Sequence, residues 1–163
     1  MKFSVLKRSS LMEILGWIFA TWFGSGLSPK APGTVGSFCS LPLVLLGIYG
    51  GLESLLGIVL VLFFVGWWAT SVVLKTQKDY DPGFIVIDET VGQSLTFLLA
   101  LPLGLNVWGV LLGFLLFRFF DIVKLWPASF FDGRVHNAFG VMMDDVIAGL
   151  YASLVLYGIL FFI

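Results

Sequence analysis

Long apolar runs are the feature that most constrains what this chain can fold into. One run lies at residues 11–23, and further runs occupy residues 37–50, 52–74, 91–101, 107–120 and 146–163. The 163 residues are 59% hydrophobic and 12% charged, whereas a soluble domain carries about a quarter charged residues. A chain of this length cannot hide so much apolar surface in one core. The sequence therefore predicts an all-α, polytopic membrane protein with a single domain over residues 1–163.

The further apolar runs fall into pairs that are separated by helix breakers. Gly50 and Gly51 divide the first pair, and Pro102, Gly104 and Asn106 divide the second. The alternative is one helix through both runs of the second pair. It would contain a proline and would be longer than the roughly 20 residues that cross a bilayer. We therefore predict two helical hairpins and a final helix, in a compact bundle of about four to five apolar helices.

Charged residues gather in four polar segments. Apart from Glu13 and Glu53, they all lie in the N-terminus or in residues 24–37, 75–89 and 118–145. Hairpins bring these segments to the same side of the membrane. Lysine and arginine favour the cytoplasmic side, so we expect the polar loops to gather on the cytoplasmic face. The net charge of −1 gives no general attraction for nucleic acid, and we expect no nucleic-acid partner.

Carboxylates in the last two polar segments form the candidate active site. The set comprises Asp88, Glu89, Asp121, Asp144 and Asp145, with Asp132 nearby. Carboxylates at a membrane are costly unless they are paired, solvated or bound to cations. Clustered oxygen ligands suit Mg²⁺, which binds through one or two carboxylates together with substrate phosphate. We expect Mg²⁺ to bind among these five residues, and the candidate catalytic acids are Asp88, Asp121, Asp144 and Asp145.

Candidate phosphate-binding groups accompany these acids. Basic side chains suit phosphate oxygens, and those in the last polar segment are Arg118, Lys124, Arg134 and His136. The loop "GSGLSPKAPGTVGS" at residues 24–37 adds glycines, which let the backbone approach an anion, and amides that can form an anion-binding nest. Its candidate hydroxyl donors are Ser25, Thr34 and Ser37. Together these features predict a site for a phosphorylated headgroup at the lipid interface.

Each feature also has a purely structural interpretation. The loop at residues 24–37 can be a break between helices, and Arg118 and Asp121 can form a plain ion pair across one helix turn. The acidic pairs at 88–89 and 144–145 precede apolar runs, where carboxylates stabilise helix N-termini. A lone histidine is more often structural than metal-binding. The gathering of all these features on one face favours function.

Spacing excludes several other enzyme chemistries. Cys39 is the only cysteine, and no arginine follows it at the distance that a cysteine-phosphatase loop needs. The single histidine excludes a two-histidine phosphatase mechanism, and no P-loop pattern is present. The stretch "FDGRVHNAFGVMMDD" has a partial CDP-alcohol phosphatidyltransferase signature, but Ala148 stands where that signature needs an aspartate. Such a transferase is the second candidate, and a small membrane transporter or scaffold is the third.

Three polar blocks, taken together, have the pattern of a known family. They are "GSGLSPKAPGTVGS" at 24–37, "IVIDETVGQ" at 85–93 and "FRFFDIVKLWPASFFDGRVHNAFGVMMDDVIAGLYA" at 117–152. The blocks cover nearly all the polar parts of the chain. On these blocks the sequence resembles the phosphatidylglycerophosphatase A family of bacterial membrane lipid phosphatases.

The resemblance implies a reaction and a location. Such enzymes hydrolyse phosphatidylglycerophosphate to phosphatidylglycerol and inorganic phosphate with Mg²⁺, as multi-pass proteins of the bacterial inner membrane whose site faces the cytoplasm. The phospholipid substrate and the bilayer are the implied partners, and the oligomeric state stays open.

A mechanism follows as a hypothesis. Mg²⁺ held by some of the five carboxylates activates a water, and a free carboxylate, for which Asp145 is our candidate, removes its proton. Arg118, Lys124 and the loop amides hold the phosphoryl oxygens. A covalent aspartyl-phosphate is the alternative that the sequence leaves open.

Overall fold

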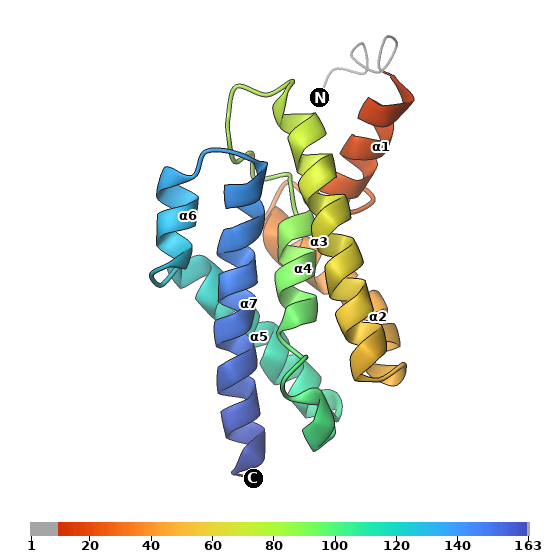
Figure 1. Cartoon of the computed structure of the whole chain (residues 1–163), viewed down its shortest axis with the longest axis vertical. Coiled ribbons are helices and arrows are strands. Elements are labelled where there is room, and N and C mark those ends of the chain that lie inside the picture. Colours follow the sequence, from red (N-terminus) through yellow and green to blue (C-terminus); the bar gives the residue numbers. More distant parts are fainter. Residues whose placement is uncertain (1–9, 163) are drawn as a thin grey trace.

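Helices make up the fold of this protein, described here from a computed structural model that covers residues 10–162 (Figure 1). Over this range the chain forms no strand, and its helices are α1 (Leu11–Ala20), η2 (Ser25–Leu27), α2 (Pro32–Tyr49), α3 (Leu52–Leu74), α4 (Ile87–Leu95), η3 (Leu101–Leu103), α5 (Val107–Val123), α6 (Ala128–Arg134) and α7 (Ala138–Phe161). The all-α prediction is confirmed. The described chain has seven α-helices where about four to five apolar ones were expected, because the apolar run at 11–23 forms α1 and part of the last polar segment forms α6.

Three helices, α2, α3 and α7, are long and apolar enough to cross a membrane. Large apolar side chains cover their outer surfaces, among them Leu46, Val61, Phe64 and Leu154. A surface of this kind is unfavourable in water and suits acyl chains. The chain is therefore a membrane protein whose outer surface contacts lipid.

Both predicted hairpins are present. A tight turn at Gly50 and Gly51 joins α2 to α3, and Gly51 has a φ of 86°, which glycine adopts without steric cost. Within the apolar run at 91–101 the helix α4 already ends at Leu95, and turns and the short helix η3 lead from there to α5 (Figure 1). Asn106 caps α5 because its side chain accepts a hydrogen bond from the Gly109 amide at 2.9 Å. The single helix over residues 91–120 is therefore excluded.

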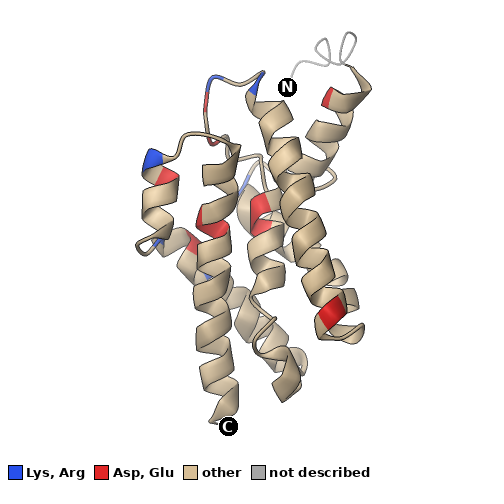
Figure 2. Ribbon diagram, viewed as in Figure 1, with Lys and Arg blue, Asp and Glu red and all other residues tan. Residues whose placement is uncertain are grey.

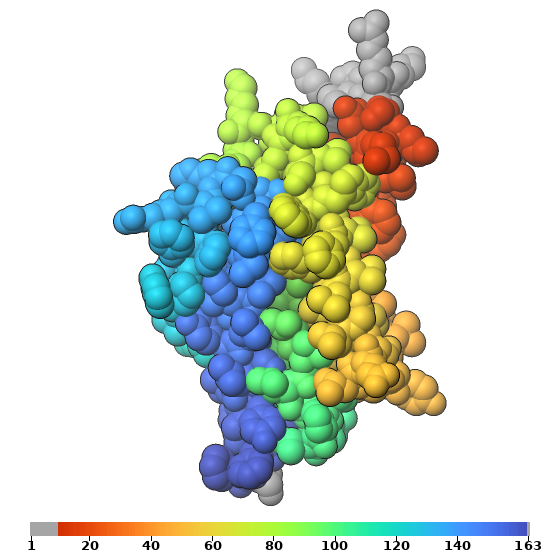
Figure 3. Space-filling model, viewed as in Figure 1, coloured from red at the N-terminus to blue at the C-terminus, as the bar shows by residue number. Residues whose placement is uncertain are grey.

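The short helix α4 lies at the centre of the bundle. It contacts α2, α3, α5 and α7, and Figure 3 shows α3 and α7 closing over it on one face of the molecule. Unlike its neighbours it is polar, with Asp88, Thr90, Gln93 and Ser94 buried. A polar helix enclosed by apolar ones brings hydrogen-bonding and ionisable groups into the interior of the bundle.

Charged side chains gather toward one end of the bundle, as the pairing of the apolar runs predicted. Figure 2 shows acidic and basic positions in the middle and at the end opposite the C-terminus. One acidic position lies at the other end, where α3 begins with Glu53 in its first turn. The predicted placement of the basic N-terminus concerns residues 1–9, which lie outside the described residues.

Candidate functional site

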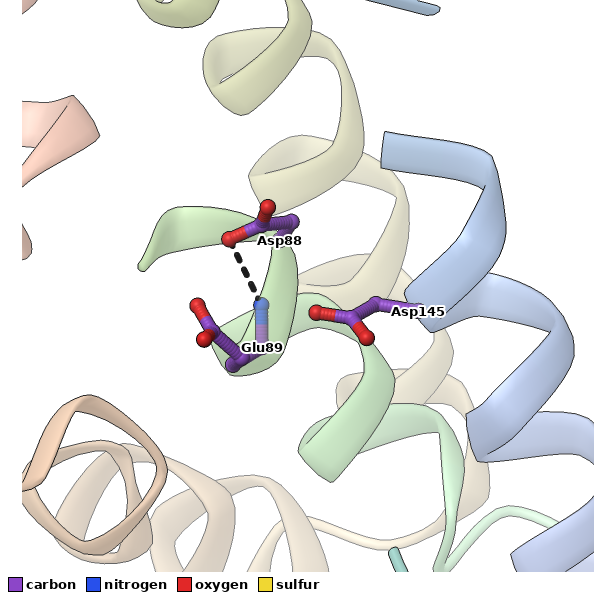
Figure 4. A group of neighbouring side chains, drawn as sticks. All are labelled: Asp88, Glu89 and Asp145. Carbon is purple, nitrogen blue, oxygen red and sulfur yellow. Dashed lines mark hydrogen bonds between the residues drawn. The ribbon is translucent and has the colours of Figure 1, made fainter. Parts of the chain in front are cut away.

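Three carboxylates meet in the middle of the bundle. Asp88 and Glu89 come from the first turn of α4, and Asp145 points toward them from α7 (Figure 4). One oxygen from each lies within 4.8 Å of the others. Asp88 is 6% exposed and Asp145 is 3% exposed. Like charges so close together and so poorly solvated need a cation or protons, and we call these three residues the acid cluster.

Arg118 of α5 lies next to the acid cluster. Its guanidinium forms an ion pair with Asp121 at 2.6 Å and lies 4.0 Å from Glu89. It also donates a hydrogen bond to the hydroxyl of Ser37 in α2 at 3.1 Å. The ion pair expected across one helix turn is present, and the same guanidinium also joins α2, α4 and α5. Sequence-predicted residues from three polar segments thus come together here.

Lys124 forms ion pairs with two further acids, Asp132 and Asp144. It ends α5 in the left-handed conformation, with a φ of 47°. Its ammonium donates to Asp144 at 2.6 Å and also to Asp132. Burial by itself would lower the pKa of Lys124, but the carboxylates of Asp144 and Asp132 outweigh burial and hold that pKa above its usual value. Asp144 is therefore neutralised by a fixed cation beside the acid cluster.

The acids of α7 do not cap that helix, which corrects one structural interpretation of the sequence. The helix begins at Ala138, and its cap is Asn137, whose side chain accepts from the Phe139 and Gly140 amides at 3.0 Å each. Asp145 lies seven residues into the helix, about 10 Å along its axis. Asp88 and Glu89, in contrast, do lie at a helix N-terminus, so the dipole favours them there.

The glycine-rich loop approaches the acid cluster through its backbone. A Cβ atom built on Gly33 would lie 3.2 Å from an Nη atom of Arg118, and it would overlap an oxygen of Glu89. A side chain at this position would displace the ends of the Glu89 and Arg118 side chains. Gly33 and Thr34 belong to the first turn of α2, which begins at Pro32 without a side-chain cap. Ser25 lies in η2, where its hydroxyl donates to the Thr21 carbonyl at 3.3 Å.

Arg134 and His136 make their contacts outside the acid cluster. The Arg134 guanidinium lies 6.0 Å from the Phe130 ring centroid, and His136 stacks on Tyr80 with ring centroids 3.9 Å apart. His136 lines a cavity of about 400 Å³, together with residues that include Lys75 and Lys78. No acid-cluster residue is among the described residues that line it. The phosphate-binding role of Arg134 and His136 stays a prediction.

Several buried polar atoms have no hydrogen-bond partner among residues 10–162. They are Oε2 of Glu89, Nε of Arg118, both amide atoms of Gln93 and, on α3, the Thr70 hydroxyl. Gln93 is not among the residues predicted from the sequence, although Gln93 follows Glu89 by four residues and so shares its helix face. The hard oxygens of the acid cluster, including the unpaired one of Glu89, fit a divalent cation such as Mg²⁺.

Comparison with known proteins gives one consistent family. The family profile described as Phosphatidylglycerophosphatase A matches residues 18–160. The chain is 38% identical over 154 residues to phosphatidylglycerophosphatase A of Escherichia coli (strain K12), covering 94% of this chain and 86% of that protein. It is 39% identical over 160 residues to phosphatidylglycerophosphatase A of Haemophilus influenzae, covering 94% and 93%.

A third relative bears a different name. It is a putative phosphatidylinositol-3-phosphatase of Bacteroides thetaiotaomicron, 37% identical over 159 residues that cover 93% of this chain and 95% of that protein. No solved structure matches the chain.

Proposed function

The chain belongs to the phosphatidylglycerophosphatase A family, and from that membership we propose that it hydrolyses phosphatidylglycerophosphate to phosphatidylglycerol and inorganic phosphate. The observation that carries this proposal is the buried acid cluster beside Arg118, in a bundle whose outer surface suits lipid. An anionic lipid keeps its acyl chains in the bilayer while its phosphate enters such a site.

The acid cluster is the proposed Mg²⁺ site. Asp88, Glu89 and Asp145 would hold the ion, which supplies Lewis-acid chemistry by polarising the phosphoryl group and lowering the pKa of a bound water. Support comes from the short spacing of the three carboxylates and from the unpaired oxygen of Glu89. Asp121 and Asp144, the other predicted ligands, have fixed cations as partners, so their proposed role is to position Arg118 and Lys124.

The remaining groups of the site bind the phosphate and move protons. Arg118 is the proposed anchor for the phosphoryl oxygens, because it lies beside the acid cluster and its Nε hydrogen is unpaired. The backbone at Gly33 and Thr34 offers amides at an uncapped helix N-terminus. A cluster carboxylate, for which Asp145 is our choice, accepts the proton of the attacking water.

The charged end of the bundle is proposed to face the cytoplasm of the bacterial inner membrane. Lys75 and Lys78 follow α3 at this end, and Arg134 ends α6 there. Basic loops are retained on the cytoplasmic side during insertion. A reporter fused after Ile163 and one inserted at Gly51 both test this orientation, since both should report the opposite side.

Phosphate release is the assay that tests the proposed function. Detergent-solubilised protein is incubated with phosphatidylglycerophosphate in Mg²⁺ and, separately, in EDTA. Release in Mg²⁺ alone is the expected result. Phosphatidylinositol 3-phosphate, chosen from the name of the Bacteroides relative, serves as a competing substrate. Folded protein that releases phosphate from neither lipid would contradict the proposal, and release of CMP from a CDP-lipid would replace it with the phosphatidyltransferase.

A further inference from the structure

Gln93 is buried in the bundle, and its side-chain amide has no hydrogen-bond partner among the described residues. The side chain is 0% exposed, and among residues 10–162 neither its amide nitrogen nor its oxygen has a hydrogen-bond partner. A primary amide offers two donor hydrogens and an accepting oxygen. Burying all of them unpaired is costly, and an apolar side chain of similar shape would avoid the cost. A residue with a purely structural role would therefore not be expected to be glutamine.

The position of Gln93 links it to the acid cluster. It follows Glu89 by four residues on α4, which places it on the same face about 6 Å farther along the helix. Glu89 itself has an unpaired oxygen, and Arg118 has an unpaired Nε. Gln93 thus lies beyond the acid cluster along α4, which runs away from the charged end of the bundle (Figures 1 and 2).

The chemistry of the lipid headgroup matches this arrangement. In phosphatidylglycerophosphate a glycerol unit with one free hydroxyl separates the terminal phosphate from the rest of the lipid. With the terminal phosphate at the acid cluster and the acyl chains in the bilayer, this glycerol lies farther from the charged end. A hydroxyl both donates and accepts, so it can pair with the amide oxygen and an amide hydrogen of glutamine.

We propose that Gln93 binds the free glycerol hydroxyl of the headgroup and is a specificity-determining residue of this site. The proposal rests on the proposed function, because it concerns the same lipid. A site that hydrogen-bonds a substrate hydroxyl discriminates strongly against an analogue without it, since the site's buried polar groups are then left unpaired. Gln93 therefore selects lipids that carry an alcohol next to the reacting phosphate.

Two lipids and two proteins test this assignment. The lipids are phosphatidylglycerophosphate and an analogue in which propanediol replaces glycerol, so that the phosphate stays and the hydroxyl is lost. The proteins are the wild type and Gln93→Met, which keeps the length of the side chain. We expect the wild type to prefer the natural lipid by about tenfold or more in kcat/KM, and Gln93→Met to hydrolyse both lipids at similar, low efficiency.

Ser94→Ala is the matched control. Ser94 lies next to Gln93 on α4 and is equally buried, but its hydroxyl is satisfied by the Thr90 carbonyl at 2.7 Å. This variant should keep the wild-type preference between the two lipids. A loss of preference in Ser94→Ala equal to that in Gln93→Met would overturn the assignment, because any disturbance of α4 would then suffice.

The remaining outcomes separate this inference from the function on which it rests. A wild type that hydrolyses both lipids equally overturns the role of Gln93 and leaves the phosphatase activity established, even if Gln93→Met fails to fold. Equal losses on both lipids in a folded Gln93→Met protein assign the residue a structural role. A wild type that releases phosphate from neither lipid overturns the proposed function and this inference together.

Discussion

Gly92 of α4 and Gly149 of α7 bring two helix backbones into contact. A Cβ atom on Gly149 would lie 2.5 Å from the Gly92 carbonyl oxygen, and a Cβ on Gly92 would lie 2.5 Å from the Asp145 carbonyl oxygen. This crossing lies one helix turn from both acidic positions, Asp88 on α4 and Asp145 on α7. The two glycines therefore determine how far apart the carboxylates of the acid cluster lie.

Gly149→Ala is expected to separate α4 from α7 and to disrupt the acid cluster. Overpacking of this kind costs about 1–3 kcal/mol of stability. A displacement of about 1 Å at catalytic groups lowers the rate by about 100-fold. Thermal unfolding and phosphate release measure both effects. Gly158→Ala on the same helix is the control, because nothing lies within 4 Å of the added methyl group, and equal behaviour of the two variants would contradict the prediction.

Asp145→Asn is expected to lower phosphate release by about 100-fold or more, because it removes a proposed ligand and proton acceptor. The folded protein should still be extractable. Glu53→Gln removes a carboxylate at the other end of the bundle and should leave the rate unchanged. Wild-type turnover by Asp145→Asn would exclude the proposed role of this residue.

Metal binding gives a readout that does not depend on turnover. A ligand that binds only the folded protein stabilises it by about 2.7 kcal/mol at 100 times its Kd. Mg²⁺ is therefore expected to raise the unfolding temperature of the wild type and of Glu53→Gln, and to raise that of Asp145→Asn much less. Removal of Mg²⁺ by EDTA should reverse the shift. Equal shifts in all three proteins would place the ion elsewhere.

Arg118→Lys keeps the positive charge and removes the forked guanidinium. A single Nη atom of Arg118 contacts both Asp121 and Ser37, so an ammonium can replace those contacts, but it offers no equivalent of the unpaired Nε hydrogen. We expect kcat to fall by about 100-fold, as on loss of a group that stabilises transition-state charge. The unfolding temperature, measured in parallel, should change little. An unchanged kcat would show that charge alone suffices at this position.

Lys124→Met leaves the carboxylate of Asp144 buried without its partner, at 5% exposure. Loss of one member of a buried pair costs about 3 kcal/mol or more. The double variant Lys124→Met with Asp144→Asn should regain much of that stability, because the carboxylate that remains without Lys124 is then that of Asp132, whose side chain is 37% exposed. Denaturant unfolding of the single and double variants measures this, and additive losses would contradict the pairing.

The same ion pair has a defined pH dependence. The folded-state pKa of Lys124 lies above its unfolded value of about 10.4, so the stability that this ammonium contributes is fully present at neutral pH. That contribution begins to decline above the unfolded-state pKa of about 10.4 and is lost as the pH rises through the folded-state pKa.

The hydrophobic pattern predicted the architecture well where a breaker stands between apolar runs. Gly50–Gly51 and Asn106 end and begin helices in the structure at the positions that their chemistry predicts. The start of α7 was placed too late, because hydropathy ends at the charged pair 144–145 while the helix continues back to Ala138. Hydropathy measures the cost of charges in lipid, and it does not register that α4 and Lys124 surround this pair.

The gathering of the carboxylates in one region was predictable from the sequence, and the partner that each of them meets was not. Asp88, Glu89, Asp121, Asp144 and Asp145 all lie in the same region, as expected. Asp121 pairs with Arg118, Asp144 pairs with Lys124, and the other three acids lie next to one another. These pairings depend on the rotation of each helix and on the distance at which the helices cross. Gly92 and Gly149 set these quantities, and in the sequence they appear only as small residues within apolar helices.

The position of Asp145 about 10 Å along α7 has a consequence for the phosphate esters that can reach it. A sugar phosphate or nucleotide in water would have to shed its hydration shell to travel about 10 Å along the helix, and it has no acyl chain whose burial offsets that cost. A membrane lipid already resides next to this level and moves sideways into the bundle. We therefore expect dissolved phosphate esters to be poor substrates of this protein, because the bilayer selects for lipids before any side chain contacts the substrate.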